Sequence, residues 1–311
     1  VVRLARRDRR QRPGWCRMIS PLASSFRGGF RNLTPMRGRG RGGGQSCAPL
    51  QALSDFVIAH RGGASIRPES TYSAYADTLA AGMFILDTDV RLTSDSGLAV
   101  IHDSTVDRTT TSSGNVSSLT KAQFTALTSD PSSFLSASGY SDETPLPTQD
   151  ALFELYRNRV IHVVEAKTAG SGPLIVDAAQ AAGIDSGHLL LQSFDQSYLT
   201  DAVSAGYPAC LLVTDLTTIT PATVKGDGID YVGASTGLDS VTVAACHSAG
   251  LKVGAWTYNR RSEWTTLQTA GVDFVWSDHG EWTAGLSSVA TTDPYATKKW
   301  WPGSLTSPVV D

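Results

Sequence analysis

Eight short apolar runs that alternate with segments of helical character constrain the fold more than any other feature of the sequence. The runs lie at residues 56–60, 83–90, 160–166, 188–194, 209–213, 229–234, 252–258 and 272–277. The helical segments, at 70–82, 146–158, 174–183, 197–206, 240–250 and 262–271, end in Gly or Asn, residues suited to cap a helix C-terminus. Strands that alternate with helices at this spacing predict a parallel sheet covered by helices.

The number of apolar runs indicates how this sheet is arranged. Eight strand–helix units match a (β/α)₈ TIM barrel, which typically takes about 250 residues. An open doubly wound sheet is the alternative, but its ligand site lies at one crevice. Polar residues follow many of the runs, which favours the barrel.

A ninth apolar run, at residues 98–102, is separated from the second run only by the turn TSDSG at 93–97. A parallel neighbour needs a crossover of a dozen or more residues. We therefore expect residues 98–102 to pair antiparallel with residues 88–92, as a β-hairpin inserted after the second strand. Residues 104–145 then form a long insertion, which we interpret as a lid or a small subdomain.

The N-terminal segment differs sharply in charge from the rest of the chain. Residues 1–45 carry twelve arginines and one acid, which makes them +11 and leaves −14 for the remainder. Such a segment buries too little apolar surface to fold, so we expect residues 1–48 to be a disordered Arg/Gly-rich extension or targeting segment. The barrel is then expected at 49–290 and a C-terminal tail at 291–311.

Composition gives weaker information on location and on cysteine chemistry. No stretch of about 18 apolar residues predicts a transmembrane helix. Lysine is scarce, with six residues in the chain, and Ser and Thr are abundant, which slightly favours a secreted over a cytoplasmic protein. The four cysteines form no CxxC pair that would indicate zinc. The sequence is compatible with one disulfide but does not assign its two cysteines.

Polar residues gather at the predicted strand ends, where a TIM barrel builds its active site. In chain order they are His60, Arg61, Glu69, Asp87, Asp89, His102, Asp103, Glu165, Lys167, Gln192, Ser193, Trp256 and Asp278. Asp87 and Asp89 are two residues apart on a strand, so their side chains point to one face. Carboxylates that converge in this way call for a cation, and oxygen ligands favour Mg²⁺ or Ca²⁺, with Mn²⁺ as a further candidate. Solvated surface acids are the competing interpretation.

Two histidines and two cations complete the predicted site. His60 and His102 end apolar runs beside charged residues, and a pair of imidazoles can supply a general base and a general acid near neutral pH. Arg61 and Lys167 suit the oxygens of a phosphodiester. The sequence carries no phosphate-binding loop ending in GKS or GKT in this region.

The same residues carry a resemblance to a known family. HRGGASIRPEST at 60–71, ILDTDVRLTSDSGLAVIHD at 85–103 and DRTT at 107–110 resemble the signature of glycerophosphodiester phosphodiesterases. VVEAKT, LLLQSF and WTYN resemble three later strands of that family, and the likeness spans roughly residues 56–285. The resemblance implies a TIM barrel and metal-dependent hydrolysis of a small glycerophosphodiester to glycerol 3-phosphate and an alcohol.

Carried over by position, the resemblance assigns roles to the site residues. His60 and His102 match the catalytic pair, with His60 favoured as the base and His102 as the acid. The metal ligands match Asp87, Asp89 and Glu165. Arg61 and Lys167 match the phosphate contacts, Glu69 lies near the metal or the substrate, and Trp256 matches an aromatic wall beside the glycerol.

Three positions depart from the family pattern. Asp87 is one methylene shorter than the Glu of the family, Ser70 replaces the Asn of PENT, and Ser96 is an additional residue in the hairpin turn. These departures put the choice of metal and the rate in doubt more than the class of reaction.

Two other functions are compatible with the sequence. A phospholipase D of the sphingomyelinase D type shares the barrel and its two histidines, and KKWWPG at 298–303 would suit a membrane surface. An inactive barrel whose arginine-rich tail binds nucleic acid is the second alternative, although we do not expect nucleic acid as a partner. The leaving alcohol and the oligomeric state are not readable from the sequence.

Overall fold

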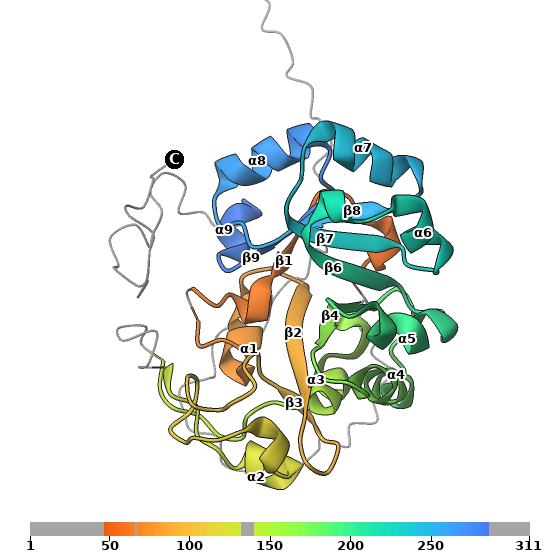
Figure 1. Cartoon of the computed structure of the whole chain (residues 1–311). Helices are drawn as coiled ribbons and strands as arrows, with labels where there is room; N and C mark the ends of the chain where they lie inside the picture. Colours follow the sequence, from red (N-terminus) through yellow and green to blue (C-terminus); the bar gives the residue numbers. More distant parts are fainter. Residues whose placement is uncertain (1–46, 66, 132–139, 286–311) are drawn as a thin grey trace, which may run out of the picture.

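The computed structural model describes residues 47–65, 67–131 and 140–285, in which eight parallel strands close into a barrel (Figure 1). The barrel strands are β1 Phe56–Ala59, β2 Ile85–Leu92, β4 Ile161–Ala166, β5 Leu189–Ser193, β6 Ala209–Asp215, β7 Tyr231–Thr236, β8 Lys252–Ala255 and β9 Phe274–Ser277. Each strand pairs with the next barrel strand, and β1 pairs with both β9 and β2, which closes the sheet. The predicted (β/α)₈ barrel is confirmed.

The ninth strand, β3 Leu98–Val100, pairs antiparallel with β2, as the short turn before it predicts. Val90 lies opposite Val100, and Leu92 lies opposite Leu98. As the chain returns along β2, the Ile101 N–H donates to the Asp89 carbonyl at 2.9 Å. The hairpin thus brings the residue that follows Ile101 back beside Asp89 of β2.

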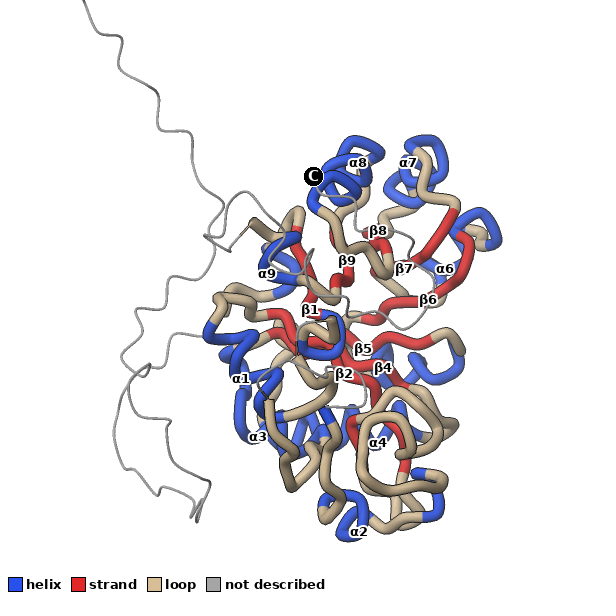
Figure 2. Tube along the Cα trace, turned by 90° about the vertical axis from the view of Figure 1, so that its left-hand side faces the viewer, coloured by secondary structure: helices blue, strands red, loops and turns tan. Residues whose placement is uncertain are grey.

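Helices lie on the outside of the barrel in both views (Figure 1, Figure 2). They are α1 Tyr72–Ala80, α2 Lys121–Thr125, α3 Gln149–Tyr156, α4 Ser171–Ala182, α5 Thr200–Ser204, α6 Pro221–Gly226, α7 Ser240–Ser248, α8 Arg261–Ala270 and α9 Gly280–Thr283. The six predicted helical segments correspond to α1, α3, α4, α5, α7 and α8. The sequence did not predict α2, α6 and α9, which have four to six residues and are too short to show a helical period.

Local sequence signals set several helix ends. The Thr71 side chain accepts the Ala74 N–H and begins α1, and the Asp239 side chain accepts two backbone N–H groups at the start of α7. Gly183 and Gly271 end α4 and α8 in the left-handed conformation. Single 3₁₀ turns lie at η1 Leu50–Ala52, η2 His60–Gly62, η3 Val116–Ser118, η5 Arg157–Arg159, η6 Gln196–Leu199 and η7 Leu216–Thr218.

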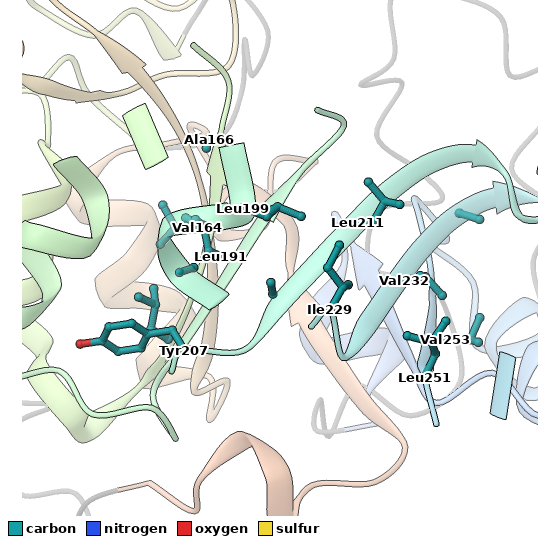
Figure 3. Packing of buried hydrophobic residues seen from close by; sticks show 14 of the residues in the cluster. Val164, Ala166, Leu191, Leu199, Tyr207, Leu211, Ile229, Val232, Leu251 and Val253 are labelled. Atoms are coloured by element: carbon teal, nitrogen blue, oxygen red, sulfur yellow. The ribbon is translucent and has the colours of Figure 1, made fainter. Parts of the chain in front are cut away.

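Alternate residues of the strands supply two separate apolar layers. One set packs between the strands and the helices; Figure 3 shows part of it, including Val164, Leu191, Val232 and Val253. The other set, which includes Phe56, Ile58, Phe274 and Trp276, fills the inside of the barrel. This division follows from the two-residue period of a strand, and it makes the interior a packed core.

The alternation of inward and outward side chains along the strands places the predicted carboxylates at the barrel mouth. Ile85 belongs to the interior layer, so Asp87 and Asp89 on the same strand face inward beyond it. Ile161 and Val163 are interior residues of β4, and Glu165 continues their face. The barrel therefore changes from apolar to charged along its own axis.

The opposite end of the barrel is closed by the segment before β1. Leu50 and Cys47 belong to the interior apolar layer, and the Leu50 N–H donates to the Gly187 carbonyl at 2.8 Å. Cys47, Cys210 and Cys246 are buried, and no disulfide joins two cysteines of the described ranges. Cys16 lies outside those ranges.

The insertion after β3 has a small apolar core of its own. Ile101, Val106, Val116, Phe124 and Leu146 form a buried cluster that lies under η3 and α2. This part of the structure includes residues 104–131 and 140–145.

The predicted N-terminal extension and the KKWWPG segment lie outside the described residues, apart from Cys47 and Ala48. Among the helices that are described, none has the length and apolar character needed to cross a membrane.

Candidate active site

The HRGG sequence forms a tight turn directly after β1. Arg61 and Gly62 both adopt left-handed backbone conformations, with φ values of 50° and 80°. A Cβ atom on Gly62 would lie 3.1 Å from the Ala74 Cβ, so both the conformation and the space favour glycine. The turn directs the Arg61 N–H to Asp87 Oδ2, at 3.0 Å. Strained backbone of this kind is typical of functional sites.

A cavity of about 180 Å³ lies at the mouth of the barrel. Of the nine residues to which the resemblance assigns a role, seven line it: His60, Arg61, Asp87, His102, Glu165, Lys167 and Trp256. Gln192, Phe194, Leu212, Thr257 and Trp276 complete the wall. Asp89 and Glu69, the other two predicted residues, are buried and contact the charged side chains of the wall.

His60 is held by a carboxylate from the last strand end. Its Nδ1 lies 2.6 Å from Asp278 Oδ1, and Asp278 Oδ2 accepts a hydrogen bond from Asn259 Nδ2 at 3.0 Å. Burial by itself lowers the pKa of His60, but the charge and hydrogen bond of Asp278 more than offset it, so the pKa is raised. The contact at Nδ1 leaves Nε2 as the nitrogen available to a substrate.

His102 is held in the same manner by its neighbour in the sequence. His102 Nδ1 lies 2.8 Å from Asp103 Oδ1. Burial lowers the pKa of His102, and the charges of Arg61 and Lys167 act in the same direction, against Asp89 and Asp103. The two cavity histidines thus share one arrangement but have opposite pKa shifts.

Asp87 is buried at the bottom of the cavity between two donors. The Gln192 Nε2 donates to its Oδ1 at 2.8 Å, and the Arg61 N–H donates to its Oδ2. Burial raises the pKa of Asp87 to about 6, and the nearby charge of Asp89 acts in the same direction. The chain thus keeps a carboxyl group of raised proton affinity inside the barrel.

Asp89 and Glu165 lie side by side, because β2 and β4 pair with these two residues in register. Lys167 Nζ lies 2.8 Å from Glu165 Oε1 and 3.3 Å from Asp89 Oδ1, and Arg61 Nε lies 3.2 Å from Asp89 Oδ2. Burial and the charge of Asp89 raise the pKa of Glu165 to about 7. Although burial opposes it, the charges of Arg61 and Lys167 hold the pKa of Asp89 well below its usual range.

The acidic side chains at the cavity have the chemistry, but not the close convergence, of a cation site. In the described part of the chain, no three His, Cys, Asp or Glu side chains converge closely enough to hold a metal ion. The donor chemistry nevertheless fits a hard cation, because the buried carboxyl groups of Asp87 and Glu165 line the cavity and that of Asp89 lies beside Glu165. Asp89 Oδ2 is buried without a hydrogen bond, and its one charged neighbour among the contacts above is Arg61 Nε at 3.2 Å. The pKa values of Asp87 and Glu165 are raised mainly by burial and further by the charge of Asp89, and a bound cation would offset both effects.

Glu69 does not line the cavity. Its Oε1 lies 3.4 Å from Arg61 Nη1, and both of its carboxylate oxygens accept hydrogen bonds from Arg108, at 2.7 and 2.8 Å. Glu69 is only 6% exposed. Its position near the predicted site is as expected, but its contacts are with two arginines of the protein.

Part of the cavity wall is aromatic and apolar. Trp256 and Phe194 pack edge to face, with ring centroids 5.4 Å apart, and Trp276 and Leu212 extend the apolar surface. The predicted strand at 252–258 ends at Ala255 because the chain then crosses toward β9, where the Tyr258 N–H donates to the Trp276 carbonyl at 3.0 Å. This crossing brings Asn259 to Asp278.

Sequence reasoning identified the charged groups of the cavity but assigned no role to the residues that hold them. From the sequence, Asp278, Gln192 and Asp103 are recognised only as polar residues at predicted strand ends. Asn259 and Arg108 lie within the WTYN and DRTT motifs, and these motifs were the available signal for both. Their partners are distant in the chain, so only the folded barrel reveals the contacts.

Comparisons with known proteins point to one family. The model of the glycerophosphoryl diester phosphodiesterase family matches residues 60–281. The glycerophosphodiester phosphodiesterase of Caldanaerobacter subterraneus is 26% identical over 238 residues, which cover 74% of this chain and 96% of that protein. Human glycerophosphodiester phosphodiesterase 1 is 38% identical over 86 residues, 26% of each protein.

Solved structures show the same fold at lower sequence identity. A phosphodiesterase of Oleispira antarctica, in complex with the product sn-glycerol-3-phosphate, has a TM-score of 0.64 at 22% identity, over 74% of this chain and 96% of that one. The glycerophosphodiester phosphodiesterase of Agrobacterium tumefaciens has a TM-score of 0.62 at 20% identity, over 74% of this chain and 99% of that one.

Proposed function

The chain belongs to the glycerophosphoryl diester phosphodiesterase family, and we propose that it hydrolyses glycerophosphodiesters to glycerol 3-phosphate and an alcohol, using a divalent cation and two histidines. The observation that carries the proposal is the pairing of two carboxylate-held histidines with two cationic side chains around one cavity. The product bound to the Oleispira antarctica phosphodiesterase supports the same substrate class.

Arg61 and Lys167 are the proposed phosphate contacts. Both line the cavity, and both are already fixed by buried carboxylates, so little side-chain freedom is lost when a phosphate binds. A guanidinium group can donate to two phosphate oxygens at once, while the ammonium group adds a point charge. Together they would stabilise the negative charge that develops on the phosphoryl oxygens during hydrolysis.

The proposed cation ligands are Asp87, Asp89 and Glu165. Their oxygens suit Mg²⁺ or Ca²⁺, and also Mn²⁺, better than zinc. When bound, the ion would polarise a phosphoryl oxygen as a Lewis acid. The carboxylates would keep the ion beside the substrate, and Gln192 and the Arg61 N–H would keep Asp87 oriented.

The two histidines divide the proton transfers. One histidine would accept a proton from the nucleophile, and the other would give one to the leaving alcohol. The nucleophile is water or the glycerol 2-hydroxyl, which would form a cyclic phosphate. The family resemblance favours His60 as the base and His102 as the acid.

Glycerol 3-phosphate release by the full chain tests the proposal. Glycerophosphocholine and glycerophosphoethanolamine would be supplied after EDTA treatment, with Mg²⁺, Ca²⁺ or Mn²⁺ added back. We expect release only with an added ion, and a loss of at least about 100-fold in His60→Ala and in His102→Ala. Folding of each variant would be checked by circular dichroism.

His247→Ala is a matched control for the two histidine variants. His247 also contacts a carboxylate, Asp273 at 2.8 Å, but it lies on α7 and does not line the cavity. Its activity should equal that of the wild type. No release from either substrate with any of the three ions, or full turnover in a folded His60→Ala or His102→Ala variant, would contradict the proposal.

A further inference from the structure

Arg108 makes paired hydrogen bonds to two carboxylates that lie far apart in the sequence. Toward Glu69, its Nη1 donates to Oε2 at 2.8 Å and its Nη2 to Oε1 at 2.7 Å. Toward Asp103, its Nε donates to Oδ2 at 2.7 Å and its Nη2 to Oδ1 at 3.1 Å. The guanidinium group is therefore bidentate on both sides, which fixes its plane.

The two carboxylates differ in burial and in what lies beyond them. Glu69 is 6% exposed, so it is a rigid anchor on the loop after β1. The side chain of Asp103 is 31% exposed, and its Oδ1 lies 2.8 Å from His102 Nδ1. A continuous chain of contacts thus joins Glu69, Arg108, Asp103 and His102. Arg108 does not line the cavity.

We infer that Arg108 is a positioning residue, which holds Asp103 against the buried anchor Glu69 and so sets the orientation and tautomer of His102. The inference rests on the proposed function for its catalytic consequence. With Asp103 fixed, the neutral imidazole carries its proton on Nδ1, and the lone pair of Nε2 is the one presented to the cavity. A half-exposed aspartate without this support would sample several rotamers.

An ordinary surface ion pair is the alternative, and its contribution would be small. The geometry argues against it, because one partner is buried and both contacts are bidentate. The hydrogen bonds that Arg108 donates to Glu69 and Asp103 outweigh the opposing effect of burial and raise the pKa of Arg108 further above its usual value. The charge of this arginine is therefore secured in the folded protein.

Three variants test the inference: Arg108→Gln, Arg108→Lys and Asp103→Asn. We expect kcat in Arg108→Gln to fall by roughly 10- to 100-fold while KM changes less than about threefold, because the affected group acts through His102. Arg108→Lys should recover only part of this loss, since an ammonium group cannot be bidentate on two sides. The double variant Arg108→Gln and Asp103→Asn should have a kcat no lower than that of the less active single variant.

A spectroscopic readout does not depend on activity. Long-range ¹H–¹⁵N spectra of the imidazole, recorded in EDTA above the titration of His102, should show the Nδ1–H tautomer in the wild type. The same spectra should show a mixture of tautomers in Arg108→Gln. The matched control is Arg157→Gln, because Arg157 is exposed and its side chain pairs with Glu154 on α3. This control should leave both readouts unchanged.

The outcomes separate the possible explanations. Wild-type kcat and an unchanged tautomer in Arg108→Gln would overturn the inference, as would a large rise in KM with kcat unchanged, which would indicate a direct substrate contact. A fall in kcat matched by a loss of folded protein in thermal unfolding would also overturn it. If the wild type releases no glycerol 3-phosphate, the proposed function fails, and the tautomer comparison still decides the role of Arg108.

Discussion

His60 Nδ1 lies 2.6 Å from Asp278 Oδ1, so a histidine after the first barrel strand is oriented by an aspartate after the last one. Asp278 is itself fixed by Asn259, which donates to its Oδ2 and accepts its backbone N–H at 2.8 Å. The closure of the barrel between β1 and β9 creates this relationship, because parallel pairing brings the ends of the two strands together.

Asp278→Asn should lower kcat by at least about 100-fold. If the new amide turns its oxygen to His60, its NH₂ group meets the NH₂ group of Asn259; if it turns the other way, it imposes the wrong tautomer on His60. Steady-state kinetics of glycerol 3-phosphate release would measure the effect. Asp177→Asn, an exposed position on α4, is the control and should match the wild type. Equal kcat in Asp278→Asn and Asp177→Asn would show that His60 needs no carboxylate partner.

The order of acid and base predicts how each histidine variant responds to the leaving group. A glycerophosphodiester of p-nitrophenol needs little protonation of its leaving oxygen, so loss of the general acid should matter much less with it. With His102 as the acid, we expect His102→Ala to recover at least about tenfold in relative kcat/KM on this substrate compared with glycerophosphocholine. His60→Ala should not recover. Recovery in His60→Ala alone would reverse this order.

His162 should make the protein less stable in acid. This imidazole is buried against Phe153, and burial lowers its pKa to about 4, below the usual value of 6.5. The folded state therefore binds fewer protons than the unfolded state, so the stabilisation is complete above the unfolded pKa and is lost as the pH falls toward 4. Over this window the free energy of unfolding should fall by roughly 3 kcal/mol from His162 alone.

His162→Gln isolates that contribution. The glutamine amide can still donate to the Arg157 carbonyl, which His162 Nε2 contacts at 3.1 Å. Urea unfolding would measure the free energy of unfolding of both proteins at about pH 7 and about pH 4. The fall in this free energy between the two pH values should be about 3 kcal/mol smaller in the variant than in the wild type. Parallel losses in the two proteins would mean that His162 does not titrate in this window.

Ser96→Gly should stabilise the hairpin that carries His102. Ser96 has a φ value of 63° in the turn between β2 and β3, a conformation that glycine adopts without the steric cost of a Cβ atom. We expect an increase of about 1 kcal/mol in the free energy of unfolding. Ser248→Gly at the end of α7, where the backbone is helical, should instead lower stability. A decrease in Ser96→Gly would indicate that the turn depends on the serine side chain.

Much of the fold was readable from local patterns. The eight apolar runs and the helical segments between them predicted the closed barrel, and the five-residue turn before Leu98 predicted the antiparallel hairpin. The same period-2 argument placed Asp87 and Asp89 on one face. These features depend on residues close together in the chain, where spacing and capping act directly.

Packing within the barrel was not readable in the same way. Gly254 leaves room for the Phe274 ring, since a Cβ atom there would lie 2.3 Å from that ring, and Gly233 does the same for Trp276. Nothing in the sequence indicates which ring each glycine faces, because that follows from the register of β7, β8 and β9.

The sequence by itself determined which charged and titratable residues the site contains: two histidines, the clustered acids and two basic residues at strand ends. The tertiary structure alone decided the partners, with Asp278 on His60, Asp103 on His102, and Arg108 between Glu69 and Asp103. It also decided that Asp89 and Glu69 contact basic side chains instead of lining the cavity. The physical reason is that strand periodicity is a local property, whereas hydrogen-bond and charge partners depend on how distant strands close into one barrel.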